Sequence, residues 1–245
     1  MELKNKIILI TGSAGTIGSV INKKLSKKNK IISVDRVKIK GKNINHYTCD
    51  LEDRIQRKKI FSKILMKYKK IDTLINCIGA TSNNYLSSKI DNQFPKIWDK
   101  FIETNLTSIF HIITMCRKNL IKSEKPSIVN IASIHALTFP DWDLYKNTKV
   151  NNLISYSVSK GGLVNMSKWL ATYLAPKIRV NTVSPGGIKK KQDQKFIKKY
   201  THKTPLKRMC KPEDVLNCVE FLINDKSDYI TGQNIRVDGG ITRSV

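Results

Sequence analysis

Acidic side chains are scarce in this sequence. Its 245 residues include 19 Asp and Glu against 45 Lys and Arg, which gives a formal net charge of +26. Such a charge suggests an anionic partner, for example nucleic acid or a membrane surface. The excess is mostly lysine and is spread along the whole chain, however, and a general drift in composition would produce the same pattern. We favour that drift, because solvated lysines leave the fold unchanged, and expect neither nucleic acid nor a membrane as partner.

Cysteine is also scarce, and it is scattered. The five cysteines never stand in CxxC spacing; they are Cys49, Cys77, Cys116, Cys210 and Cys218. An odd number without that spacing argues against both a disulfide framework and a zinc site. We therefore expect no bound metal and a reducing, cytoplasmic compartment.

Long apolar runs and targeting signals are missing as well. The first residues, MELKNKIILITG, do not show a charged segment followed by a long apolar segment and a cleavage site. No apolar run approaches the length of about 18 residues that crosses a bilayer. No linker, repeat or low-complexity run divides the chain. A chain of this length can bury one sizeable core, so we expect residues 1–245 to form one domain.

The clearest local pattern is the apolar run Lys6–Thr11, which is followed at once by GSAGTIG and then by a mixed polar and apolar segment. It predicts a strand, a glycine turn and a helix. Glycines in such a turn let the backbone approach a pyrophosphate, which then lies at the N-terminus of the helix. The residues expected to contact a dinucleotide here are Gly12, Ser13, Gly15, Thr16, Ile17 and Gly18.

A second apolar run, Ile31–Val34, ends in Asp35 at the distance from the glycine turn that is typical of a ribose-binding acid. The Asp35 carboxylate could accept hydrogen bonds from both ribose hydroxyls and would repel a 2′-phosphate. Arg36 favours the opposite, because a guanidinium could bind that phosphate. We expect both residues to lie beside the ribose, and NAD(H) to bind in preference to NADP(H).

Strand and helix patterns alternate along the rest of the chain. Further strands are expected at HYTCDL, which ends at Asp50 and Leu51, and at IDTLINCIG, which runs into Asn76, Ile78 and Gly79. SIVNIAS, IRVNTVSPGGI and GQNIRVDGG follow. This alternation predicts an α/β fold, a single doubly wound Rossmann domain whose parallel sheet has helices on both faces. Ligands of such sheets bind at the carboxyl ends of the strands.

The segment Ser155–Ala175 is expected to be a helix because its apolar residues recur at helical spacing. Tyr156 and Lys160 stand four residues apart at its start and so share one face. An ammonium beside a phenol favours the phenolate and lowers its pKa, which suits acid–base chemistry near neutral pH. Many helices carry such a pair by chance, so the pair alone does not establish a site.

Other segments bear on the same site. A long helix expected over Pro95–Leu120 holds Asn105 in its middle, where an asparagine often only bridges to neighbouring backbone. The strand SIVNIAS ends in Ser133. The loop 135–155 is long, and we expect it to shape substrate access. The segment 188–203 is very basic and poorly periodic, which predicts a mobile lid.

A series of motifs spans nearly the whole chain in one order: TGSAGTIG, CDL, NCIG, TNLTS, NIAS, YSVSK, IRVNTVSPGGI and ITGQNIRVDGG. This series resembles the classical short-chain dehydrogenase/reductase family. The resemblance implies a nicotinamide-dependent oxidoreductase that interconverts a secondary alcohol and a ketone. It also implies a homotetramer or homodimer in which the helices that carry Asn105 and Tyr156 pack against a neighbouring subunit.

The resemblance further assigns roles to single residues. Tyr156 would be the proton donor or acceptor at the substrate oxygen, and Lys160 would hold the nicotinamide ribose and lower the pKa of the tyrosine. Ser133 would hydrogen-bond the reacting carbonyl, and Asn105 would hold a water in a proton relay behind Lys160. The other cofactor contacts that it implies are Asp50 and Leu51 at the adenine, Asn76, Ile78 and Gly79 near the ribose, and Pro185, Gly186 and Ile188 along the nicotinamide.

Two features depart from the family pattern. Thr16 occupies the position of the second glycine in the usual TGxxxGxG turn, so the turn around the pyrophosphate is expected to differ. Ser133 and Tyr156 are separated by more residues than is usual. With YKNTKVNNLISYSVSKGGL and the later SPGGI, this insertion resembles a bacterial subgroup linked to flagellin modification and to nonulosonic or amino-sugar pathways.

Three functions are therefore open. The leading hypothesis is an NAD(H)-dependent oxidoreductase for a sugar or nucleotide-sugar, in which Lys189, Lys190 and Lys191 either attract an anionic group of the substrate or are merely solvated. The alternative enzyme is a 3-oxoacyl-carrier-protein reductase, whose acidic carrier would suit a basic surface; Trp142 and Tyr145 do not decide between sugar and acyl chain. A non-catalytic nucleotide- or nucleic-acid-binding protein is the third, and the four candidate catalytic residues argue against it.

Overall fold

The fold is organised around a parallel sheet of seven strands. The computed structural model describes residues 3–81 and 95–242, and the strands lie in the order β3-β2-β1-β4-β5-β6-β7, with each neighbouring pair parallel. Their bounds are β1 Ile7–Thr11, β2 Lys30–Asp35, β3 Ile44–Thr48, β4 Thr73–Asn76, β5 Ser127–Ile131, β6 Arg179–Pro185 and β7 Asn234–Val237. This order confirms the predicted doubly wound arrangement, which proceeds outward from β1 in both directions.

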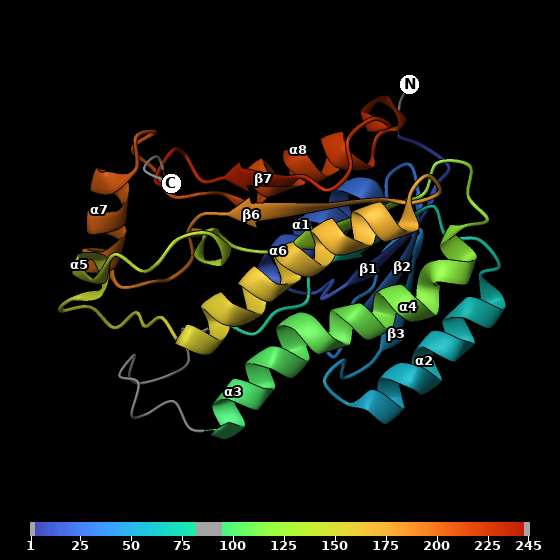
Figure 1. Ribbon diagram of the computed structural model, residues 1–245, viewed down its shortest axis with the longest axis horizontal. Helices are drawn as coiled ribbons and strands as arrows, with labels where there is room; N and C mark the ends of the chain where they lie inside the picture. Colours follow the sequence, from blue (N-terminus) through green and yellow to red (C-terminus); the bar gives the residue numbers. More distant parts are fainter. Residues whose placement is uncertain (1–2, 82–94, 243–245) are drawn as a thin grey trace.

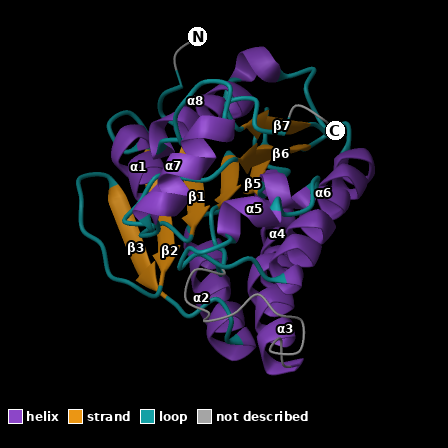
Figure 2. Ribbon diagram, turned by 90° about the vertical axis from the view of Figure 1, so that its left-hand side faces the viewer, coloured by secondary structure: helices purple, strands orange, loops and turns teal. Residues whose placement is uncertain are grey.

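Helices cover both faces of the sheet, as predicted. Figure 2 shows α1 and α8 on one side and α2, α4 and α6 on the other. The helices are α1 Thr16–Leu25, α2 Arg54–Lys67, α3 Pro95–Ile102, α4 Ser108–Leu120, α5 Trp142–Tyr145, α6 Ile154–Leu174, α7 Gln194–Lys203 and α8 Pro212–Ile223. Among the helices that the structure describes, none combines the length and the apolar composition that a membrane span requires.

Two apolar cores hold these layers together, one on each face of the sheet. Phe61 of α2, Ile112 of α4 and Leu163 of α6 belong to the first and are fully buried. Ile21 of α1 and Val219 of α8 belong to the second and are also fully buried. Because both faces are covered, the central strands consist of nearly continuous apolar runs, which is the pattern that made them recognisable in the sequence.

The expected helix over Pro95–Leu120 is present, but it is not regular. A π-turn over Glu103–Thr107 joins α3 to α4 without a break in the chain direction (Figure 1). A π-turn carries one extra residue in the helical turn, and such turns are frequent at functional sites. The turn contains Asn105, which is fully buried, so the irregularity falls on the residue singled out in the sequence.

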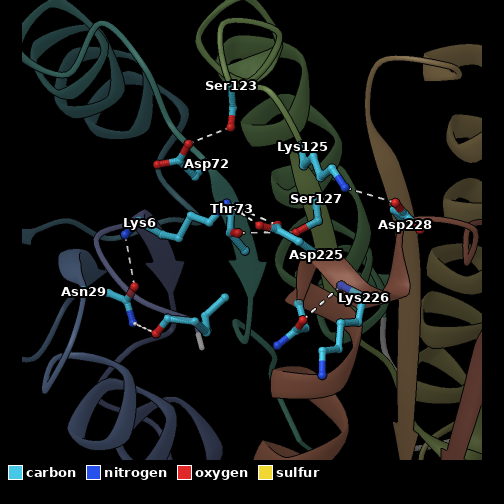
Figure 3. Close-up of polar contacts among 12 residues, drawn as sticks. Lys6, Asn29, Asp72, Thr73, Ser123, Lys125, Ser127, Asp225, Lys226 and Asp228 are labelled. Carbon is cyan, nitrogen blue, oxygen red and sulfur yellow. Dashed lines mark hydrogen bonds and ion pairs between the residues drawn. The ribbon is translucent and has the colours of Figure 1, made fainter. Parts of the chain in front are cut away.

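The amino ends of the strands are closed by polar contacts (Figure 3). Asp72, which precedes β4, accepts hydrogen bonds from the backbone of Ile7 at 2.8 Å and from the Ser123 hydroxyl at 2.6 Å. Lys6, which precedes β1, forms an ion pair with Asp225 at 3.1 Å. The polar groups at the amino ends of the strands therefore find their hydrogen-bond and ion-pair partners within the protein, in contrast to the carboxyl ends described below.

The segment 188–203 differs from the expected poorly periodic lid. Residues 194–203 form helix α7, whose inward face buries Phe196 and Tyr200. The two rings lie 5.7 Å apart, and Phe196 also lies 5.6 Å from the ring of Tyr145 in α5. Lys195, Lys198 and Lys203 of α7 are exposed, and the many lysines of this helix conceal its apolar face in the sequence. The loop 135–155 likewise contains regular structure, a short 3-10 turn at Ile134–Ala136 and helix α5.

Removal of the Phe196 ring should release α7 from the body of the protein. Truncation of a buried phenylalanine costs about 3 kcal/mol or more, and here the loss falls on one small apolar cluster. We expect Phe196→Ala to be cleaved by trypsin within residues 194–203 much faster than the wild type, whereas Gln194→Ala, on the exposed side of α7, is not. Equal cleavage rates of the two variants would show that this contact does not hold the helix.

Candidate active site

Two connected clefts lie along the carboxyl ends of the strands. The larger has a volume of about 550 Å³ and the smaller of about 380 Å³. Their linings share Gly15, Cys77, Gly79 and Thr81, which lie where β1 and β4 end. This is the place where the strand order reverses, and ligands of doubly wound sheets bind there.

The glycine turn borders both clefts and is sterically fixed. Gly12 has a φ of +64°, and a Cβ there would lie 2.5 Å from the backbone nitrogen of Ile78. A Cβ on Gly18 would lie 2.2 Å from the carbonyl oxygen of Gly12. Thr16 is exposed as the first residue of α1, so the departure from the family pattern leaves the close packing of Gly12 and Gly18 intact.

The N-terminus of α1 has the free backbone N–H groups that an anion could bind. Gly15 is its cap, no side chain bonds the free backbone N–H groups, and the first turn holds no acidic residue. Because these N–H groups and the helix dipole favour negative charge, the turn fits a pyrophosphate. Ser13 lies beneath the turn, where its hydroxyl is 2.6 Å from that of Ser33, and it does not line either cleft.

Asp35 is held at the wall of the larger cleft, at the end of β2. One carboxylate oxygen accepts a hydrogen bond from the backbone of Ala14 and the other from that of Val37, both at 2.9 Å. Arg36 is exposed beside it in the same lining. The structure therefore places in one cleft wall both Asp35, which favours NAD(H), and Arg36, which favours NADP(H). Asp50, Leu51, Ile78 and Gly79 line the same cleft.

The Leu51 loop is fixed from below by a fully buried arginine. Arg57 of α2 is 1 % exposed and donates to the carbonyl of Leu51. It also pairs with Glu103 of the π-turn at 3.0 Å and donates to the imidazole of His111 at 2.9 Å. Burial, followed by the neighbouring guanidinium groups, lowers the pKa of His111 and keeps the ring a neutral acceptor. The arginine thus ties the larger cleft to the turn that bears Asn105.

Ser133 and Tyr156 face each other in the wall of the smaller cleft. A hydrogen bond with the Ser133 side chain lowers the pKa of Tyr156, but burial raises it more, so the net shift is upward. The helical pairing of Tyr156 with Lys160 predicted a lowered pKa for Tyr156, and that prediction is wrong for the protein alone. The physical reason is desolvation, which disfavours a phenolate, and Lys160 is not among the groups that shift this pKa.

Lys160 lies behind Gly79 and lines neither cleft. Its ammonium donates to the carbonyl of Ile131 at 2.8 Å, and a Cβ on Gly79 would lie 3.2 Å from it. The side chain is 4 % exposed. Burial lowers the pKa of Lys160 to about 8, so the amine retains its proton at neutral pH by a small margin.

Asn105 acts as a clamp. Its side-chain oxygen accepts from the backbone of Ala80 at 2.7 Å, and its amide donates to the Ser159 hydroxyl at 3.0 Å. It therefore ties the chain after β4 to the first turns of α6. Asn76 is also fully buried and bonds to Thr11 and Asn130, at 3.0 and 2.8 Å. Neither Asn105 nor Asn76 lines a cleft.

The smaller cleft also holds His135 and Asn152, which sequence reasoning missed, and Tyr145, which it named only as an aromatic residue of the loop. His135, Tyr145 and Asn152 line it and contact one another. His135 stands two positions after Ser133, which is the one local signal that could have found it; only the fold brings Tyr145 and Asn152 to it. The expected residues Thr16, Ile17, Gly18, Pro185, Gly186 and Ile188 also line this cleft, together with Ala132, Ile134, Val150, Asn151, Gly187, Lys190, Gln192, Phe196 and Met209. The described residues contain no group of His, Cys, Asp or Glu that could hold a metal.

Several known proteins are similar to this chain in sequence and in fold. A family model described as enoyl-(acyl carrier protein) reductase matches residues 19–242. The chain is similar to the 3-oxoacyl-(acyl-carrier-protein) reductase of Thermotoga maritima, with 33% identity over 98% of this chain and 99% of that protein. It is also similar to the post-translational flagellin modification protein A of Campylobacter coli, with 30% identity over 97% and 98%.

A solved structure agrees with these relatives. The crystal structure of a short-chain dehydrogenase from Leptospira borgpetersenii with bound NAD+ matches with a TM-score of 0.88 and 33% identity, over 98% of this chain and 93% of that chain. The chain belongs to the short-chain dehydrogenase/reductase family of NAD(P)-dependent oxidoreductases.

The buried Lys160 should destabilise the folded protein at neutral pH. Its pKa is near 8 when folded and 10.5 when unfolded, so holding the charge costs about 3 kcal/mol below pH 8, and this cost vanishes as pH rises to 10.5. We expect Lys160→Met to raise the free energy of unfolding in urea by about 1–3 kcal/mol at pH 7, with a smaller gain at pH 10. Lys168→Met, exposed on the same helix, should change little; lower stability of Lys160→Met at pH 7 would contradict this.

Proposed function

We propose that this protein interconverts a secondary alcohol and a ketone by hydride transfer with NAD(P), with Tyr156 as the acid–base group. The proposal is carried by one observation: Ser133 and Tyr156 face each other in a cleft that continues, past Gly79, into the cleft of the glycine turn. A substrate oxygen between the two hydroxyls would adjoin the space for a dinucleotide. Such adjacency is what hydride transfer requires of a protein.

The cofactor supplies the hydride when it is bound. On the protein side, the α1 N-terminus would hold the pyrophosphate, Asp35 and Arg36 would lie at the adenosine ribose, and Lys160 would hold the nicotinamide ribose. The remaining contacts that we propose are Gly12, Gly15, Thr16, Ile17 and Gly18 at the turn, Asp50, Leu51, Ile78 and Gly79 in the larger cleft, and Tyr156, Pro185, Gly186 and Ile188 in the smaller. Ser13 and Asn76 would support these residues from beneath.

The proton moves at the Tyr156 hydroxyl. In the direction of reduction, the carbonyl carbon gains a hydride and the carbonyl oxygen gains the Tyr156 proton, while Ser133 donates a hydrogen bond to the same oxygen. In the direction of oxidation, both transfers reverse. We propose that Asn105 acts by position, because its side-chain groups are already bonded to Ala80 and Ser159, and not as a direct ligand of a relay water.

We also propose that NAD(H) is preferred over NADP(H). Both oxygens of Asp35 are held in the cleft wall by backbone N–H groups, so the carboxylate cannot turn away from a 2′-phosphate. Like charges placed together in this way cost several kcal/mol. Arg36 is exposed and can leave the site, which makes it the weaker of the two influences.

A second enzymatic function is supported by a specific finding. The Thermotoga maritima relative is a 3-oxoacyl-(acyl-carrier-protein) reductase, and Lys190 of this chain lines the smaller cleft and precedes the basic helix α7 in the sequence. An acidic carrier protein would suit that surface. The same lysine could equally attract an anionic sugar or nucleotide-sugar, so its charge does not separate the two substrates.

The outer face of α6 supports assembly. Trp169 and Tyr173 stack with their ring centroids 4.9 Å apart, and each is 61% exposed. Phe110 of α4 is 44% exposed. Large exposed apolar groups of this kind mark interaction surfaces, and we propose that a homotetramer or homodimer forms here.

All five cysteines are free thiols, which supports the proposed reducing cytoplasm.

Cofactor preference can be measured directly. We expect NADH, followed by nicotinamide fluorescence, to bind roughly tenfold or more tightly than NADPH, and to keep its affinity at high salt. Asp35→Ser should narrow this ratio, whereas Asp228→Ser, at the opposite edge of the sheet, should not. Tighter NADPH binding would assign the dominant role to Arg36. Binding of neither nucleotide, together with salt-sensitive binding of a random oligonucleotide, would favour the non-catalytic alternative.

Loss of the Tyr156 hydroxyl should stop turnover without affecting cofactor binding. Acid–base catalysis contributes about 10² to 10⁴ in rate, so Tyr156→Phe should lower kcat by that factor and leave the NADH dissociation constant close to that of the wild type. Tyr229→Phe, which removes a fully exposed hydroxyl, serves as the control. Turnover retained in Tyr156→Phe would exclude the proton role.

A further inference from the structure

Three polar side chains converge in the smaller cleft beside the proposed reacting atoms. The Tyr145 hydroxyl lies 3.3 Å from the Nε2 atom of His135 and 3.2 Å from the amide nitrogen of Asn152. That nitrogen also lies 3.3 Å from the His135 ring. The His135 ring meets Tyr156 edge to face, with ring centroids 6.2 Å apart. We call His135, Tyr145 and Asn152 the polar trio; it has no part in the proton chemistry described above.

All members of the polar trio are uncharged at neutral pH. Burial lowers the pKa of His135 to about 4, so its ring carries one N–H donor and one bare nitrogen acceptor. Burial raises the pKa of Tyr145 to about 12, so its hydroxyl keeps its proton. Neutral groups that both donate and accept match a hydroxyl group better than a phosphate or carboxylate, which would call for a cation.

The trio cannot use all its protons internally. If Nε2 of His135 is bare, Tyr145 donates to it, and the Nδ1–H of His135 has no acceptor within the trio. If Nε2 carries the proton, it donates to Tyr145, and the Tyr145 O–H is left over in the same way. With the Asn152 amide nitrogen turned toward the ring and the hydroxyl, as in this structure, one donor of His135 or Tyr145 has no acceptor within the trio in either tautomer, and it is available to an oxygen that enters the cleft.

We propose that the polar trio is a subsite for a second oxygen of the substrate, and that the substrate is therefore a ring-shaped polyol, a sugar unit, rather than an acyl chain. This inference rests on the proposed function, because the first oxygen is the one between Ser133 and Tyr156. Both sets of groups line the same cleft, and the His135 and Tyr156 ring centroids are 6.2 Å apart, so one small ring could present an oxygen to each.

The rest of the smaller cleft suits such a ring. Val150, Phe196 and Met209 give it an apolar wall, while Asn151 and Gln192 add amide groups to the lining. A sugar ring presents C–H groups on its faces and hydroxyls at its rim, so it satisfies both kinds of surface. An alkyl chain would shield the polar groups of the trio from solvent and offer them no hydrogen bond in return. Such desolvation would weaken the binding of an alkyl chain.

The trio is tested without relying on turnover by adding Tyr145→Phe to the Tyr156→Phe background. Titration calorimetry with the NAD+-loaded protein compares free hexoses and UDP-linked hexoses with cyclohexanol, a ring with one hydroxyl, and with acetoacetyl-coenzyme A. We expect at least one hexose compound to bind more tightly than the other two probes. Tyr145→Phe should weaken it about tenfold and weaken cyclohexanol little, whereas Tyr229→Phe should weaken neither.

A double-mutant cycle adds the second readout. If the trio acts as one subsite, His135→Phe and Tyr145→Phe together should weaken hexose binding by less than the product of their separate effects. Tighter binding of cyclohexanol or of the acetoacetyl thioester than of every hexose compound, or unchanged hexose binding in Tyr145→Phe, would overturn the inference. Absence of turnover in the wild-type protein, with these binding results intact, would count against the proposed function alone.

Discussion

Parallel pairing of the strands is the constraint on which the rest of this protein depends. It brings the carboxyl ends of all seven strands to one edge, so residues distant in the sequence, such as Gly12, Asp35 and Ser133, border connected clefts. The opposite edge is closed by Asp72 and its neighbours, which satisfy one another (Figure 3). The polar groups at the amino ends of the strands are bonded to one another, whereas the carboxyl ends border the clefts in which a ligand could bind.

Local pattern explains what the sequence could predict. The strands are continuous apolar runs, the glycine turn and Asp35 follow them directly, and the spacing of Tyr156 and Lys160 on α6 is a matter of helix geometry. The parallel sheet and most of the cofactor cleft follow from such patterns, since each depends on residues close together in the chain. Asn105 was also recognisable, although not the π-turn that contains it.

What the sequence could not predict depends on burial and on distant contacts. The pKa of Tyr156 rises because the folded protein desolvates its ring, whereas the local pattern predicted a fall from its neighbour Lys160. Helix α7 was hidden because lysines outnumber Phe196 and Tyr200 in its sequence. The three residues of the polar trio lie in the predicted loop 135–155, on the 3-10 turn, on α5 and just before α6, and no spacing rule shows that their side chains meet once the chain has folded.

The buried guanidinium of Arg57 has a consequence for how this family member can change over generations. It joins the Leu51 carbonyl, Glu103 and His111, and its own side chain is almost fully buried. Loss of one partner from a buried ion pair costs about 3–5 kcal/mol, while exchange of both for apolar residues costs little. Position 57 and position 103 therefore cannot drift separately, and descendants of this sequence inherit or lose the pair as one unit.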